Sequence, residues 1–205
     1  MLNIFIIALA LFPTSTATRT TNTPASGVTR VVIISRAGSL TVTGKNGATE
    51  IRSTGKAEAS SDAELAKTQI VASHQGSQLT IEELVPDESF LSSSPTIDME
   101  VTVPAGVPVV IRDGSGSINV NDTGDLDVTD GSGSIDIENV TGNVRITDGS
   151  GSIDVKKVSG SVTITDDGSG SVNVADVRGN FTVQQKGSGH IDYERIGGKV
   201  SVPKK

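Results

Sequence analysis

The sequence Asp-Gly-Ser-Gly-Ser-Ile at residues 113–118 decides the fold, because it returns along the second half of the chain. The motif begins again at Asp130, Asp148 and Asp167, where Val replaces the final Ile, and a degraded copy begins at Lys186. Successive copies start 17, 18, 19 and 19 residues apart. This period suits one coil of a β-solenoid and is too short for a helical hairpin repeat. The sequence therefore predicts an all-β chain in which residues 104–205 form a single-stranded β-solenoid with coils of about 18 residues.

Apolar residues keep the same place in every copy, which predicts ladders of side chains inside the solenoid. Burial of each Val or Ile contributes roughly 1.5 to 3 kcal/mol, and a single coil cannot bury its own apolar face. Stacking of the coils is therefore obligatory. Two of the predicted ladders are Ile118, Ile135, Ile153, Val172, Ile191 and Val120, Ile137, Val155, Val174, Tyr193.

Residues 29–103 form a β-rich N-terminal part that is continuous with the solenoid. A capping-box spacing from Ser61 to Glu64 predicts a short helix near 62–68. The Asn46-Gly47 dipeptide predicts a tight hairpin between residues 39–43 and 50–52. Residues 97–103 alternate strictly between apolar and polar, as a half-buried strand does.

The first 17 residues carry no charge and contain an apolar run that ends in small residues, which is typical of a secretory signal peptide. The alternatives are an uncleaved anchor and a mis-chosen start codon. Residues 18–28 are rich in Thr and lack periodicity, so we expect a disordered linker there. No later stretch is apolar enough to cross a bilayer. The expected location is extracytoplasmic, either periplasmic or secreted.

Composition narrows the set of partners. The chain has 205 residues, a formal net charge of −7 and no cysteine, which excludes disulfides and thiolate metal sites. Its basic residues are scattered, whereas nucleic-acid binding needs a clustered positive face. We therefore expect a cell-envelope or surface partner, either protein or glycan, and no nucleic acid. The open end of a solenoid also allows a homo-oligomer.

Three features together resemble a known family: the signal-like start, the segment Leu40-Thr41-Val42-Thr43-Gly44 followed later by Val101-Thr102-Val103-Pro104, and the serial Gly-Ser-Gly-Ser-Ile-Asp-Val coils. This combination is similar to the bacterial putative-adhesin, β-strand-repeat family of unknown function. The resemblance covers about residues 29–202. It implies an extracytoplasmic solenoid, and it supplies no catalytic residue to carry over.

The repeated aspartates are the candidate metal ligands. Asp113, Asp130, Asp148 and Asp167 are expected in one column along a corner of the solenoid, where hard carboxylate oxygens could bind calcium. In the alternative, each side chain accepts hydrogen bonds from the backbone of its own turn, and the solvated column needs no cation. We predict no other cofactor.

Catalytic motifs are few. The only histidines are His74 and His190, and no Gly-x-Ser-x-Gly elbow is present. We therefore predict a non-enzymatic envelope scaffold or adhesin-like interaction module. The alternatives are a calcium-stabilised adhesin and a carbohydrate-active enzyme that uses the outward carboxylates Asp136, Asp154 or Asp192.

Overall fold

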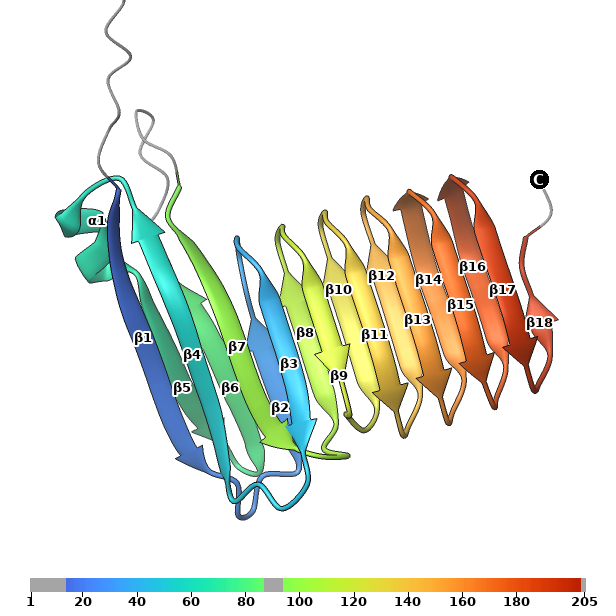
Figure 1. Ribbon diagram of the computed structural model, residues 1–205, viewed down its shortest axis with the longest axis horizontal. Coiled ribbons are helices and arrows are strands. Elements are labelled where there is room, and N and C mark those ends of the chain that lie inside the picture. The colour runs from blue at the N-terminus through green and yellow to red at the C-terminus, as the bar shows by residue number, and fades with distance from the viewer. Residues whose placement is uncertain (1–13, 87–93, 204–205) are drawn as a thin grey trace, which may run out of the picture.

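The structure is a computed structural model that describes residues 14–86 and 94–203 (Figure 1). Residues 1–13, which include most of the predicted signal peptide, lie outside the described residues. Two nine-stranded sheets and one short helix, α1 (Asp62–Lys67), make up the regular structure of the described part. The prediction of an all-β chain is thus confirmed.

The two sheets lie face to face along the length of the molecule (Figure 1). Sheet A has the order β1 (Ser15–Pro24), β4 (Glu50–Ala59), β7 (Thr96–Pro104), β3 (Leu40–Lys45), β9 (Ile118–Asn121), β11 (Ile135–Val140), β13 (Ile153–Val158), β15 (Val172–Val177) and β17 (Ile191–Ile196). Sheet B has the order β18 (Val200–Ser201), β16 (Phe181–Ser188), β14 (Val162–Ser169), β12 (Val144–Asp148), β10 (Leu126–Asp130), β8 (Val109–Asp113), β2 (Arg30–Ile34), β6 (Gln78–Leu84) and β5 (Gln69–Gln75).

From β8 onward, consecutive strands alternate between sheet B and sheet A, and every neighbouring pair is parallel. We call one strand of sheet B together with the following strand of sheet A a coil. The predicted ladders are confirmed: Ile135 pairs with Ile118 and Ile153, and Ile137 pairs with Val120 and Val155. These side chains form a continuous core between the sheets.

Glycine in the Gly-Ser-Gly turn is required by the close approach of neighbouring coils. Gly133 has φ +137°, and a Cβ atom added to it would lie 1.5 Å from the carbonyl oxygen of Gly116 in the preceding coil. Backbone packing therefore excludes any larger residue. The turn also continues the ladder of hydrogen bonds, because the Gly133 N–H donates to the Ser150 carbonyl at 2.9 Å.

The predicted hairpin between β3 and β4 is wrong. Residues Asn46 and Gly47 do form a turn, but β7 lies between the two strands, parallel to β3 and antiparallel to β4. The strictly alternating β7 buries Ile97, Met99 and Val101 against the core, and this burial outweighs the local preference of the turn for direct pairing.

The N-terminal part contributes coils to the same stack in an order that differs from the sequence. Val31 of β2 pairs with Val109 of β8 on one side and with Leu79 of β6 on the other. In sheet A, Leu40 of β3 likewise pairs with Ile118 and Met99. The β2–β3 coil therefore lies between the β6–β7 coil and the β8–β9 coil, although it comes first in the chain.

The N-terminal end of the stack is covered by β1, β5 and α1. The prediction of a disordered linker over 18–28 is wrong, because β1 pairs antiparallel with β4 over ten residues and residues 25–28 form a turn. An outer strand faces solvent on one side, so its Thr-rich sequence lacks the apolar alternation that would have revealed it. Arg19 of β1 donates from Nε to the Thr68 carbonyl at 2.8 Å and from Nη2 to the Leu65 carbonyl at 2.7 Å.

The predicted helix is confirmed as α1. Its N-cap Ser61 accepts a hydrogen bond on Oγ from the Glu64 N–H at 3.3 Å, and Leu65 packs onto the core. The Arg19 side chain thus ties the end of this helix to the edge strand of sheet A.

Candidate functional site

The four repeated aspartates do form one column, at the ends of β8, β10, β12 and β14. Asp130 pairs with Asp113 and Asp148, and Asp148 pairs with Asp167. The expected solvated corner is wrong, however, because the four residues are only 9, 4, 2 and 0% exposed in chain order. Their carboxyl groups lie inside the stack.

Strand alternation explains this inward direction. Val109 and Ile111 of β8 face the core, and a two-residue period places Asp113 on the same face. In β14 an extra residue would shift this period, but a bulge opposite Ile146 and Thr147 restores it, so Asp167 rather than Asp166 continues the column. The two-residue alternation from Val109 through Ile111 to Asp113 was the sequence signal that could have predicted the burial of the aspartates.

The hydrogen bonds of the column are incomplete. Asp130 and Asp148 each accept on Oδ1 from the N–H two residues ahead, at 3.3 Å, which confirms the predicted turn bonding for these two residues. Oδ2 of each, and both carboxyl oxygens of Asp113 and Asp167, are buried without a hydrogen-bond partner in the structure. Buried carboxylates without donors are costly, whereas protonated carboxyl groups are not charged and can also donate.

Burial accordingly raises the pKa of all four aspartates. The pKa of Asp130 rises to about 6, first because of burial and then because of the neighbouring Asp113 and Asp148 charges. The pKa of Asp148 also rises to about 6, mainly through burial. The column therefore holds protons at a pH where exposed aspartates are ionised.

Glu83 extends the column toward the N-terminal end, and we did not predict it. It is fully buried at the end of β6, next to Ser35, whose Oγ donates to it at 3.1 Å, while the Arg36 N–H donates at 2.9 Å. Burial raises its pKa to about 7. At the other end Asp167 pairs with Lys186. The alternation Leu79, Ile81, Glu83 was the available signal.

Within residues 14–86 and 94–203, no group of three or more His, Cys, Asp or Glu side chains is arranged to hold a metal ion. Calcium binding by the column stays a prediction. The inward direction of the carboxyl groups and their raised pKa values favour protons as the neutralising species.

The outward carboxylates of sheet A line a shallow groove of about 240 Å3 with Asn119 and Lys156. Asp136 and Asp154 are neighbours in one row, which continues through Asn173 to Asp192. Asp154 accepts on Oδ2 from the Asn173 amide at 3.4 Å. Neighbouring side chains of one row point the same way, whereas a glycosidase needs two carboxyl groups on either side of the scissile bond.

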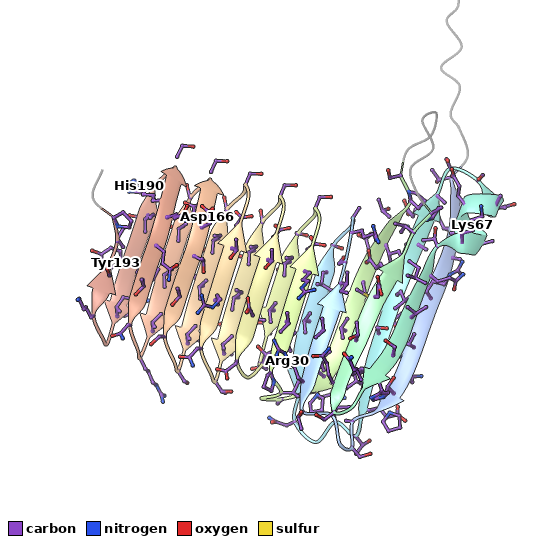
Figure 2. All side chains as sticks on the ribbon, turned by 180° about the vertical axis from the view of Figure 1, so that it is seen from behind. Arg30, Lys67, Asp166, His190 and Tyr193 are labelled. Carbon is purple, nitrogen blue, oxygen red and sulfur yellow. The ribbon has the colours of Figure 1, made fainter. Side chains whose placement is uncertain are left out.

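A larger groove of about 660 Å3 crosses the outer face of sheet B, perpendicular to its strands. Pro108 and Val110 are among its apolar residues, and its charged residues are Arg30, Asp125, Asp127 and Arg145. Arg30 lies where the N-terminal part meets the repeated coils (Figure 2).

The two arginines of this groove form no ion pair with any described residue, and Arg145 donates only to Thr165 Oγ1, at 3.4 Å. By contrast, Asp125 at the groove edge accepts from the N–H and side-chain amide of Asn143, at 2.7 and 3.3 Å. The groove therefore presents guanidinium donors that lack a carboxylate partner. Sequence analysis missed this site, because the repeats by themselves do not show which arginines lie beside a concave surface.

The two histidines lie at opposite ends of the molecule. His74 is in β5, and His190 is on the last coil, where its Nε2 lies 3.2 Å from Asp192 Oδ1 (Figure 2). The described residues contain no helix that is long and apolar enough to span a membrane.

No protein-family model and no curated protein matches the sequence. Solved structures do resemble it. A putative cell adhesion protein from Clostridium sporogenes is 11% identical, with a TM-score of 0.43 over 92% of this chain and 100% of that chain. A putative adhesin from Bacteroides fragilis is 13% identical, with a TM-score of 0.39 over 91 and 97%. A putative lipid binding protein from Parabacteroides distasonis is 12% identical, with a TM-score of 0.33 over 91 and 97%.

Proposed function

We propose that the chain is a non-enzymatic β-solenoid of the cell envelope, located outside the cytoplasm, which binds an acidic envelope polymer in the sheet B groove. The observation that carries this proposal is the presence of Arg30 and Arg145, both without an ion-pair partner among the described residues, in the sheet B groove. The uncharged, apolar start of the chain supports the location.

The chemistry of the groove favours a ligand with carboxylate or phosphate groups. Guanidinium groups present a planar fork of donors that matches such anions, often in a bidentate way. Asp125 and Asp127, at the start of β10 between the two arginines, disfavour a dense cluster of negative charge and favour anionic groups that are spaced apart.

The spacing of the arginines suits an extended ligand. Arg30 is in β2 and Arg145 is in β12, with β8 and β10 between them. Three steps between neighbouring strands correspond to about 14 Å. A polymer with repeated acidic groups can reach both arginines, whereas a single small anion can reach only one.

Binding of the full chain to immobilised polygalacturonate tests the proposal, with dextran as the neutral control. The double variant Arg30→Gln, Arg145→Gln is expected to bind at least about tenfold more weakly, since each charge-assisted hydrogen bond contributes roughly 1.5 kcal/mol or more. Arg52→Gln, on the outer face of β4, should bind like the wild type. Equal binding to dextran, or no loss in the double variant, would contradict the proposal.

The carbohydrate-active alternative rests on the smaller groove at Asp136 and Asp154. It predicts release of reducing ends from a glycan and loss of that turnover in Asp154→Asn. Turnover that depends on Asp154 would replace the binding proposal by an enzymatic one.

A further inference from the structure

We propose that the C-terminal end of the stack is an interface that binds the same end of a second copy of this chain. The last strands, β17 and β18, are the outer edges of sheet A and sheet B. Each edge strand leaves backbone N–H and C=O groups on one side without a partner strand among the described residues, and such an edge is a template for strand pairing.

The inward ladders become accessible at this end. Val172 and Val174 are 0 and 1% exposed. The next members of the same two ladders are less covered: Ile191 is only partly buried, and Tyr193 is 49% exposed. Figure 2 shows Tyr193 on the last coil, at the end of the molecule opposite α1. On the sheet B side, Val200 is only partly buried, whereas Phe181, with which it pairs, is fully buried. The end surface is thus a section through the core.

Arg195 and its acidic neighbours around this section are already paired within the chain, whereas the exposed Lys199 forms no ion pair with any described residue. Arg195 Nε lies 2.5 Å from Asp176 Oδ1, and a second nitrogen of Arg195 contacts Glu194. His190 lies beside Asp192. Contact with another surface can leave these ion pairs intact, and the flexible Lys199 side chain can keep its ammonium group in solvent at the rim, so no unpaired charge need be buried.

A second copy is the partner that fits this section. An extended peptide would cover one sheet edge and leave the other open, since stacked sheets lie about 10 Å apart. A two-fold axis that runs from sheet A to sheet B places β17 against β17 and β18 against β18, each pair antiparallel. This arrangement covers both edges and the ladder ends, and it closes the assembly at two copies. At the N-terminal end β1 and β5 are also edge strands, but they and α1 cover the core, so that end exposes no section through the ladders.

The size of the section predicts a weak dimer. A coil with strands of six residues is about 20 Å long, and with its outward side chains about 20 Å wide, so each copy would bury roughly 400 Å2. The total of about 800 Å2 is below the range of stable interfaces. Strand pairing must therefore supply much of the affinity, and association should depend on protein concentration.

Sedimentation equilibrium of the full chain, from about 1 to about 300 µM, tests the proposal through the mass-action shift from one copy to two. Tyr193→Asp should stay monomeric over this range, and Leu84→Lys, which changes an exposed apolar residue of β6, should dimerise like the wild type. A wild-type chain that stays monomeric, or a Tyr193→Asp chain that dimerises equally, would overturn the proposal.

A disulfide probe gives a second readout that does not depend on a disruptive substitution. The chain has no cysteine, so Ser201→Cys places a single thiol at the edge of β18, and Thr20→Cys places one on β1 at the other end. Under mild oxidation, Ser201→Cys should form covalent dimers at least about tenfold faster than Thr20→Cys. Equal rates, or a faster reaction of Thr20→Cys, would contradict an interface at the C-terminal end.

Discussion

The two ends of the stack are completed in different ways. At the N-terminal end, β1, β5 and α1 cover the core, and Arg19 links the edge strand to the carbonyls that end the helix. At the C-terminal end, no described strand pairs with the outer edges of β17 and β18, and Tyr193 is half exposed. The difference shows that the repeat specifies how coils stack but does not specify how a stack ends. Residues outside the repeat must do so, or a partner must.

The largest expected effect of a single substitution comes from the same change made in the middle and at the open end of one ladder. Ile153→Ala should lower the free energy of unfolding by about 3 kcal/mol, because it opens a cavity between two packed coils. Ile191→Ala should cost about 1 kcal/mol, since its side chain is only partly covered. Urea denaturation of dilute, monomeric protein measures both. Equal losses would mean that the open end is as well packed as the middle.

The pH dependence of the free energy of unfolding tests whether the buried carboxyl column in the middle of the stack is protonated. The pKa values of Asp130 and Asp148, about 6, and of Glu83, about 7, exceed the values of about 4 expected in the unfolded chain. The folded state therefore binds these protons more tightly. Their contribution is fully present below about pH 4 and is lost as the pH rises through 6 and 7. Integrated over these three groups, the free energy of unfolding is expected to fall by several kcal/mol, at most about 5 kcal/mol, between pH 5 and pH 8.

The double variant Asp130→Asn, Asp148→Asn should flatten this dependence, while Asp136→Asn, on the outer face, should leave it unchanged. Urea denaturation at pH 5, 6, 7 and 8 gives the slopes. The pKa values of Asp98 and Asp176 are lowered by their donors, so these residues act in the opposite direction, but only in more acidic solution. Stability that increases from pH 5 to pH 8 would contradict the protonated column.

A smaller loss of unfolding free energy is expected when a contact at the N-terminal end of the stack is removed. Arg19→Ala removes the donors to the Thr68 and Leu65 carbonyls, and it should cost about 1.5 kcal/mol. Arg52→Ala removes only a contact with an exposed Thr54 hydroxyl and should cost less than about 0.5 kcal/mol. Thermal denaturation of the two variants separates the cases. A similar loss in both would mean that Arg19 does not hold the N-terminal cover in place.

The repeated part of the fold could be predicted in detail from the sequence. Period and alternation together placed Ile135 beside Ile118 and Ile153, because every copy repeats the same inward positions. The helix at 62–67 followed from its N-cap. These features depend on residues that are close in the sequence or that recur at the same position in every repeat.

Features that depend on distant, unrepeated contacts could not be predicted. β1 is polar, and only its pairing with β4 makes it a strand. The turn at Asn46 and Gly47 is present, but the longer apolar face of β7 displaces β4 from β3. The aspartate column was predicted as a column, while its burial was missed because a carboxylate was assumed to prefer water. The sheet B groove joins β2 to residues some 80 to 130 positions later in the chain, which no local pattern reveals.

The position of the β2–β3 coil has a consequence for the order in which the chain folds. This coil emerges first from the ribosome, yet its neighbours on both sides, β6–β7 and β8–β9, are synthesised later. Folding therefore cannot proceed by adding coils in order from the N-terminus. The strands β2 and β3 can form their backbone hydrogen bonds only after the strands on both sides of them have been synthesised. Once covered, it is the segment that a force applied at the C-terminus would reach only after every later coil had been peeled away in turn.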